Sequence, residues 1–142
     1  MRQQSKVRCL QWLAVFAFGV FCMSTAQAAI KSQIIEYRQG DTLLEGYLSY
    51  DDSFSGKRPG VLVIHTWTGV GDYIKGRADM LARMGFVAFA PDIYGKGVRP
   101  RPPKDAGAEM AKYTSNRPLY RARALSGLEV LRAHALVDTA RL

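Results

Sequence analysis

The stretch Val61-Leu-Val-Ile-His-Thr-Trp-Thr-Gly-Val-Gly-Asp-Tyr73 changes character at its middle. Its first four residues are aliphatic, which is typical of a short strand buried on both faces of a sheet. The residues after them are polar, aromatic or glycine, which is more than a simple turn requires. Ligands of open α/β sheets bind beyond the carboxyl ends of the strands. The stretch therefore predicts a strand over residues 60–64 with a candidate site directly after it.

A strand–helix–strand unit is predicted from the residues that follow. A helix is expected from Tyr73 to Met84, capped by Asp72, because its apolar side chains recur on one face. Gly85 then ends the helix, and residues 86–90 form a second buried strand. Two strands joined through a helix are parallel, and the crossover is right-handed.

The flanking segments complete an α/β fold. On the N-terminal side, alternating residues predict a β-hairpin of Gln33–Arg38 with Thr42–Tyr50, followed by a loop over 51–59. On the C-terminal side we expect, in order, a loop over 92–104, a helix over 105–113, a longer helix from 116 to about 137, and a strand starting in 139–142. The predicted fold class is α/β, with an N-terminal β-hairpin leading into an open parallel-sheet half-domain that is incomplete.

Residues 1–28 have the organisation of a secretory signal peptide. Arg2, Lys6 and Arg8 precede a short apolar run, and Ala26-Gln27-Ala28 provides a small-residue cleavage site. The apolar run is shorter than the roughly 20 residues of a membrane span, although an uncleaved anchor is the alternative. We expect cleavage that leaves one domain over 29–142, export to the periplasm or the medium, and no stable membrane anchor.

Charge and cysteine content limit the possible functions. The sequence has 20 Lys and Arg against 12 Asp and Glu, and three of the 20 lie in the leader, which leaves 17 − 12 = +5 for residues 29–142. No basic stripe is interleaved with stacking aromatics, so nucleic acid is not an expected partner. Both cysteines, Cys9 and Cys22, belong to the leader, and the glycines miss the dinucleotide fingerprint. We therefore expect neither a metal nor a cofactor.

Two strand-end segments together resemble the dienelactone hydrolase family of the α/β-hydrolase fold. They are Val61–Tyr73, quoted above, and Ala90-Pro-Asp-Ile-Tyr-Gly-Lys-Gly97, and the resemblance continues through Asn116-Arg-Pro-Leu-Tyr-Arg-Ala-Arg-Ala124. The resemblance implies an α/β-hydrolase fold and hydrolysis of small-molecule esters or lactones, including substrates that bear a carboxylate.

The resemblance also implies roles for three residues. Trp67 matches the position whose backbone N–H contributes half of the oxyanion hole, where a donor must face the oxygen that becomes negative. Thr66 stands where family members commonly have a glutamate. The resemblance implies that Thr66 contacts the substrate, but threonine lacks the charge with which the glutamate can activate a thiol. Lys96 lies two places after Tyr94, where dienelactone hydrolases carry a basic residue that holds the substrate carboxylate.

Other polar residues near the strand ends are interpreted as structural. The catalytic histidine and acid of the family come later in the chain, so His65 and Asp92 are expected to be held by hydrogen bonds. Arg99, Arg101 and Lys104 are expected to be solvated side chains of a basic loop.

The nucleophile elbow of the family is missing from residues 29–142, which contain neither G-x-S-x-G nor G-x-C-x-G. In the family it follows the strand expected to begin near Arg141, and the acid and histidine come after it. We therefore expect an N-terminal fragment of an exported hydrolase, truncated before the elbow and inactive alone. The alternative is a non-catalytic truncated or pseudogene product, or a binding module that uses the basic loop. The sequence leaves the substrate, the choice between Ser and Cys, and the oligomeric state open.

Overall fold

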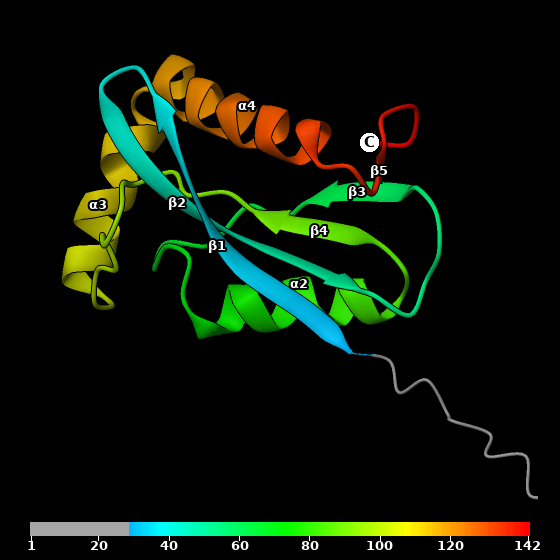
Figure 1. Ribbon diagram of the computed structural model, residues 1–142. Helices are drawn as coiled ribbons and strands as arrows, with labels where there is room; N and C mark the ends of the chain where they lie inside the picture. Colours follow the sequence, from blue (N-terminus) through cyan, green and yellow to red (C-terminus); the bar gives the residue numbers. More distant parts are fainter. Residues whose placement is uncertain (1–28) are drawn as a thin grey trace, which may run out of the picture.

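The computed structural model describes residues 29–142, in which five strands form one sheet of order β1-β2-β4-β3-β5 (Figure 1). Neighbours β1 and β2 are antiparallel, as are β2 and β4, whereas β3 runs parallel to both β4 and β5. The predicted hairpin leading into a parallel α/β sheet is thus confirmed. The strands are β1 Ile30–Gln39, β2 Thr42–Asp51, β3 Arg58–Leu62, β4 Val87–Ala90 and β5 Val137–Asp138.

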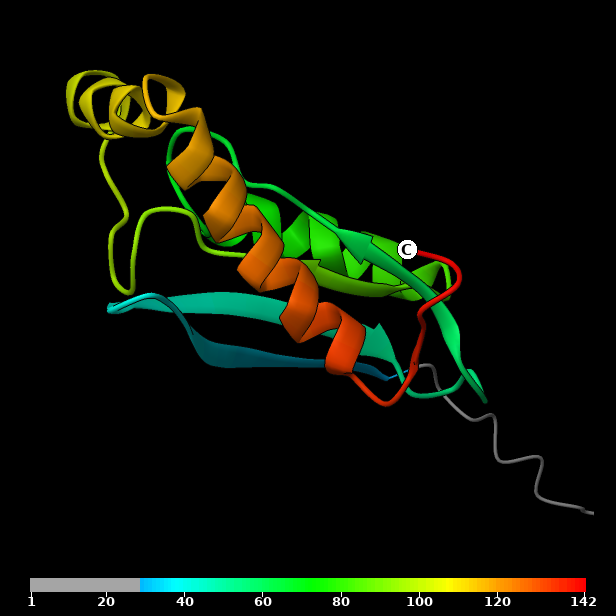
Figure 2. The same cartoon turned by 90° about the horizontal axis from the view of Figure 1, so that it is seen from above.

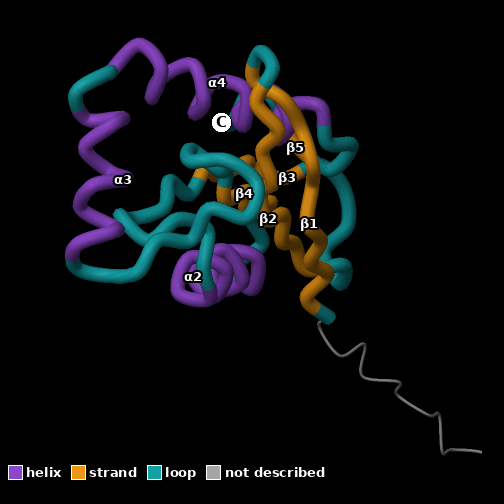
Figure 3. Tube along the Cα trace, turned by 90° about the vertical axis from the view of Figure 1, so that its left-hand side faces the viewer, coloured by secondary structure: helices purple, strands orange, loops and turns teal. Residues whose placement is uncertain are grey.

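Three helices complete the described part of the chain: α2 Asp72–Arg83, α3 Lys104–Thr114 and α4 Arg117–Ala133. Helix α2 lies on one face of the sheet and α4 on the other, while α3 lies beyond the ends toward which β3 and β4 point (Figures 1 and 3). Figure 2 shows α4 running across the sheet from α3 toward β5. No helix in this range is long and apolar enough to cross a membrane. The predicted signal peptide lies outside the described residues.

The core has a separate cluster on each side of the sheet and a third at the strand ends. Phe89 and Leu131 belong to the cluster under α4, and Val70 and Ile74 to the cluster under α2. The third cluster contains the buried side chains of Ile93, Tyr94 and Tyr113. This third cluster matters most for function, because it supports the loops at the carboxyl ends of β3 and β4.

The β1–β2 hairpin extends well beyond β4. Strand β2 pairs with β4 only from Tyr47 to Ser49, so its first half continues past the carboxyl end of β4. There it meets the loop after β4: the Lys96 amide donates to the Leu43 carbonyl oxygen at 3.0 Å. The hairpin therefore forms a wall behind the loops that carry the candidate site.

The predicted end of helix α4 and the predicted position of the last strand are wrong. Helix α4 ends at Ala133, not near Val137, because His134 takes up extended backbone and its amide closes the helix on Leu131. Instead of a strand over 139–142, Val137 and Asp138 pair with the start of β3. The Asp138 carboxylate then accepts from the Ala140 amide at 3.1 Å, which turns the chain out of the sheet.

Strand β3 and helix α2 also begin differently from the prediction. Strand β3 starts at Arg58, which the sequence places in a loop, because its amide donates to the Leu136 carbonyl at 2.8 Å and its side chain is buried. Gly71, not Asp72, caps α2, and the helix has no side-chain cap. Asn116 does cap α4, since its side-chain oxygen accepts from the Leu119 amide at 3.2 Å.

Candidate active site

The loop after β3 holds the Trp67 peptide by its carbonyl and leaves its amide free. The Tyr94 hydroxyl donates to the Trp67 carbonyl oxygen at 3.2 Å. Within residues 29–142 the Trp67 N–H donates to no protein acceptor. A free, fixed backbone N–H at a strand end is what an oxyanion donor requires. The role itself stays a prediction, because no nucleophile lies opposite this amide in the described residues.

Gly69 lets this loop pack closely on the loop after β4. Its φ of 79° lies in the left-handed region, which only glycine adopts without cost. A Cβ at this position would lie 2.9 Å from the Val98 carbonyl oxygen. The two strand-end loops therefore touch through backbone, and only the absence of a side chain at Gly69 permits this contact.

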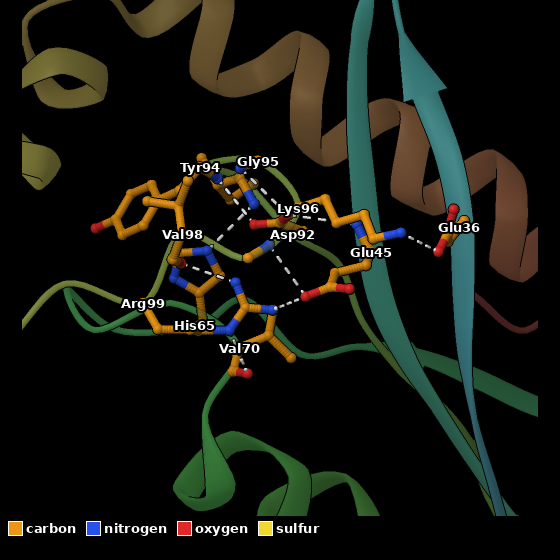
Figure 4. Close-up of polar contacts among 12 residues, drawn as sticks. Glu36, Glu45, His65, Val70, Asp92, Tyr94, Gly95, Lys96, Val98 and Arg99 are labelled. Atoms are coloured by element: carbon orange, nitrogen blue, oxygen red, sulfur yellow. Dashed lines mark hydrogen bonds and ion pairs between the residues drawn. The ribbon is translucent and has the colours of Figure 1, made fainter.

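Arg99 ties the two loops to the hairpin, and the prediction that it is a solvated side chain is wrong. Its Nε donates to the Val70 carbonyl oxygen at 2.8 Å, and one terminal nitrogen donates to the Glu45 carboxylate at 2.9 Å (Figure 4). The other donates to the Val98 carbonyl oxygen at 2.8 Å. A planar guanidinium with several donors is suited to such a three-way contact. Arg99 thus fixes the loop that carries Trp67.

His65 is held by both ring nitrogens, as the sequence interpretation expected. The Ile93 amide donates to Nε2 at 3.2 Å, so Nε2 is an acceptor and the proton belongs on Nδ1. Nδ1 then donates to the Thr66 carbonyl oxygen at 2.6 Å. Burial lowers the pKa of His65, which favours this neutral form. His65 has no free nitrogen for general-base chemistry.

A loss of stability in mild acid follows from the neutral state of His65. Burial also lowers the pKa of His134, with a smaller contribution from Arg58. Both histidines thus bind protons more readily in the unfolded chain, so their stabilising effect is full above their ordinary pKa of 6.5 and is lost as the pH falls below it. We expect the free energy of unfolding to drop from pH 7.5 to 5.5, by at most about 1.4 kcal/mol per pH unit and histidine.

Urea unfolding at the two pH values measures this drop. The His134→Gln variant isolates the part that belongs to His65. The pKa values of the Asp51 and Asp138 carboxylates are lowered from the ordinary 3.8. These two groups therefore affect the free energy of unfolding only at pH values more acidic than this interval. A protein that becomes more stable over this interval would contradict the assigned neutral state.

Asp92 organises the loop after β4 and takes no exposed position in the site. Its side chain is fully buried. The carboxylate accepts from the amides of Tyr94 at 3.0 Å, Gly95 at 3.1 Å and Glu45 at 3.3 Å. The expectation that Asp92 is held by hydrogen bonds is confirmed, and these bonds join the loop to the hairpin wall.

The two predicted substrate-binding residues take different positions. Thr66 lines the pocket beside the Trp67 loop, and its hydroxyl lies 3.4 Å from that of Thr68. Lys96 points the other way, to the exposed face of the hairpin, where its Nζ lies 2.5 Å from the Glu36 carboxylate (Figure 4). Lys96 does not line the pocket, and a role for it in substrate binding stays a prediction.

A pocket of about 240 Å³ opens between the Trp67 loop and helices α3 and α4. Tyr94 and Tyr113 stack in its wall with ring centroids 5.1 Å apart, and the Tyr113 hydroxyl donates to the Tyr94 carbonyl oxygen at 2.9 Å. Burial raises the pKa of Tyr94 to about 12 and also raises that of Tyr113, so both phenols are neutral. The lining residues are His65, Thr66, Trp67, Tyr94, Met110, Tyr113, Thr114, Arg117 and Tyr120.

Sequence reasoning missed the contribution of α4 to this site. Arg117 and Tyr120 line the pocket from its first turn, and both stand in a segment that carried the family resemblance without an assigned role. Arg123 is buried and joins the hairpin turn to the loop after β4, since it donates to Gln39 at 2.9 Å and to the Ile93 carbonyl at 3.1 Å. Residues 29–142 contain no group of three His, Cys, Asp or Glu that could hold a metal ion.

The model of the dienelactone hydrolase family matches residues 44–141. "Protein usf" of Aquifex pyrophilus is 39% identical over 88 residues, which are 60% of this chain and 36% of that protein. A protein of Aquifex aeolicus named "Putative carboxymethylenebutenolidase" matches with the same identity and the same coverage.

Solved structures agree with the family match. A dienelactone hydrolase-like promiscuous phosphotriesterase from metagenomic libraries superposes with a TM-score of 0.74 and 32% identity, over 80% of this chain and 47% of that one. The structure named m3DLH gives a TM-score of 0.76 and 34% identity, over 80% and 48%. The chain therefore spans about a third of the length of the two Aquifex proteins and about half of these structures.

Proposed function

We infer the function from the family and from the geometry of the site: this chain belongs to the dienelactone hydrolase family. We propose that it supplies the oxyanion loop and the substrate pocket of a hydrolase that acts on small ester or lactone substrates. The observation that carries the proposal is the free N–H of Trp67, a residue of the loop after β3 that lines the pocket. In ester hydrolysis such a donor stabilises the negative oxygen that forms when the carbonyl carbon is attacked.

The nucleophile, the acid and the catalytic histidine are proposed to come from sequence outside these 142 residues. Two features support this. No nucleophile elbow occurs in residues 29–142, and the match covers only 36% of the Aquifex pyrophilus protein and 47% of the phosphotriesterase structure. The second oxyanion donor would come from the same outside segment, since it belongs to the residue after the nucleophile.

Export is part of the proposal, with the leader 1–28 removed before Ala29 to give a periplasmic or secreted protein. The basic start, the apolar run and Ala26-Gln27-Ala28 support it. Sequencing the N-terminus of exported material tests it, and a mature protein that begins at Met1 would argue against it. The alternative of a binding module on the basic loop is less well supported, because Lys96 and Arg99 are both engaged by carboxylates.

The hydrolase proposal is tested by comparing two proteins with p-nitrophenyl acetate as substrate. We expect no enzyme-level turnover from the 142 residues. We expect saturable turnover from a protein that continues through the coding DNA past Leu142, if that frame encodes G-x-S-x-G or G-x-C-x-G within the next few residues.

A stoichiometric burst in the longer protein would titrate the acyl-enzyme nucleophile. Replacing the Ser or Cys of the elbow by Ala should abolish both the burst and the turnover. Saturable turnover by the 142 residues alone would place the chemistry within this chain and would contradict the proposal.

A further inference from the structure

Helix α2 is apolar on the side that faces away from the sheet as well as on the side that packs against it. On the outer side, Tyr73 and Met80 of the helix and Met84 directly after it are 68%, 51% and 70% exposed. No element of residues 29–142 covers this side (Figures 1 and 3). Because the outer side of a surface helix is normally polar, this surface has the composition of a contact site.

The three exposed side chains form a line along the helix, which we call the outer stripe of α2. Consecutive helical residues are rotated by about 100°. Met80 and Met84 follow Tyr73 by seven and eleven residues, so each lies within about 20° of it around the axis. Single exposed apolar residues are ordinary, but an aligned set that runs from the first turn to the end of a helix forms a continuous apolar track.

Two opposite charges border the outer stripe on one flank. Asp72 is the first residue of α2 and Arg83 is the last, and each directly precedes a residue of the stripe. They therefore lie on the same flank of the helix, at opposite ends. Both are exposed, and within residues 29–142 neither makes an ion pair. An acid at one end and a base at the other complement the same flank of a second copy that runs in the opposite direction.

One antiparallel alignment of two copies satisfies the charges and the stripe together. With Ala78 at its centre, Asp72 and Arg83 lie six and five residues from the centre, and Tyr73 and Met84 lie five and six. Asp72 therefore faces Arg83 of the second copy, and Tyr73 faces its Met84, where sulfur and an aromatic ring attract each other. Both contacts occur twice, because a two-fold contact uses the same patch on each copy.

The middle of the helix fits the same alignment. Gly76 and Met80 lie two residues on either side of Ala78, so Met80 of one copy faces Gly76 of the other. Gly76 is exposed, and a Cβ there would have nothing within 4 Å, which leaves a gap for the methionine side chain. Arg77 opposes the contact, because it lies near its own copy across the centre. Its guanidinium is directed along its own helix, 3.7 Å from the Met80 sulfur.

We propose that two copies of this chain associate through α2, in a symmetric antiparallel contact between their outer stripes. A helix of 12 residues is about 18 Å long, so the contact falls below the roughly 1,600 Å² of a standard interface. A weak, reversible dimer with a Kd of about 10–100 µM is expected. The contact residues do not line the pocket. The proposal therefore goes beyond the proposed function and does not depend on hydrolysis.

Cross-linking tests the direction and the register of the contact. The Cys9→Ser, Cys22→Ser background removes both cysteines, and Tyr73→Cys and Met84→Cys are added in separate proteins. With a short thiol-reactive cross-linker, we expect dimers only when the two proteins are mixed. Equal positions of the two copies are about 15 Å or more apart along the axis. The mixed pair also keeps one natural contact between tyrosine and methionine.

Sedimentation equilibrium of charge variants tests the energetics. Asp72→Arg and Arg83→Asp should each weaken association at least about fivefold, because like charges then face each other. The combined swap should restore it to within about twofold. Asp105→Arg is the matched control, since it removes an exposed acid from the first turn of α3 and should leave association unchanged. Arg77→Gln should strengthen it. All variants carry the same leader, and circular dichroism verifies that each is folded.

Four results would overturn the proposal. Dimers cross-linked between equal positions would mean a parallel contact. Equal cross-linking of Tyr73→Cys with Arg121→Cys, an exposed position on α4, would mean random collision or aggregation. A combined charge swap as weak as either single reversal would reject the paired charges. A monomer at concentrations well above the expected Kd would leave the outer stripe to a different protein or to another segment of a longer chain.

Discussion

Trp67→Pro is expected to lower kcat of the longer hydrolase by about 10²–10³-fold, the loss that follows removal of one oxyanion donor. Proline has no N–H, so the substitution deletes the one group of Trp67 that the proposed mechanism uses. The donor acts on the transition state more than on the bound ester. The loss should therefore appear in kcat, with KM changed little. Steady-state hydrolysis of p-nitrophenyl acetate measures both constants.

Trp67→Phe is the matched control for this effect. It keeps the backbone N–H and an aromatic ring in the pocket, so kcat should stay within about threefold of the parent. Because proline also restricts the residue before it, circular dichroism and thermal unfolding are compared for both variants. Equal kcat for the folded proline variant and the parent would show that the Trp67 amide is not an oxyanion donor.

Asp92→Ala is expected to destabilise the folded chain by about 4 kcal/mol or more, the largest stability effect of any single substitution considered. Three backbone amides donate to this buried carboxylate, and a hydrogen bond to a charged group contributes about 1.5–3 kcal/mol. Alanine leaves all three donors buried without a partner. A loss of this size is a large fraction of the stability of a small domain.

Urea unfolding of two further variants shows whether the carboxylate is the cause. Asp92→Asn keeps one oxygen acceptor and should lose less than alanine. Asp52→Ala removes an exposed carboxylate that lies 3.4 Å from Lys31, a type of contact worth about 0–1 kcal/mol. If Asp92→Ala cost no more than Asp52→Ala, the three amide contacts would not hold the loop in solution.

Local patterns were sufficient to predict most of the helices and strands and the edge of the sheet at which the pocket opens. Aliphatic runs marked β3 and β4, and the polar and glycine residues after each run marked the edge where the pocket opens. The errors arose where contacts with residues far away in the sequence determine the local structure. Arg58 and Pro59 look like loop residues until β5 pairs with them, and the pattern of α4 continues past Ala133 although its backbone does not.

Arg99 and Arg123 were missed because their partners are far away in the sequence. Arg99 resembles its basic neighbours, and only a partner 54 positions away, Glu45, shows that it is fixed. The partner of Arg123 in the hairpin turn, Gln39, is 84 positions away. Arg117 was overlooked for the opposite reason, because an unpaired arginine in the first turn of a helix is ordinary until a pocket forms beside it. Charge alone could not separate these three arginines.

The two walls of the pocket differ in how many contacts a substitution in each of them would disturb. On one side, Arg99 and the Tyr94 hydroxyl fix the Trp67 loop, and a single substitution there disturbs several contacts at once. On the other side, α3 presents Met110 and Thr114, whose side chains are exposed. Mutations at those two positions can reshape the pocket while the Trp67 loop is left intact. Substitutions that change which molecules the pocket accepts, in nature or in laboratory selections, should therefore accumulate on α3.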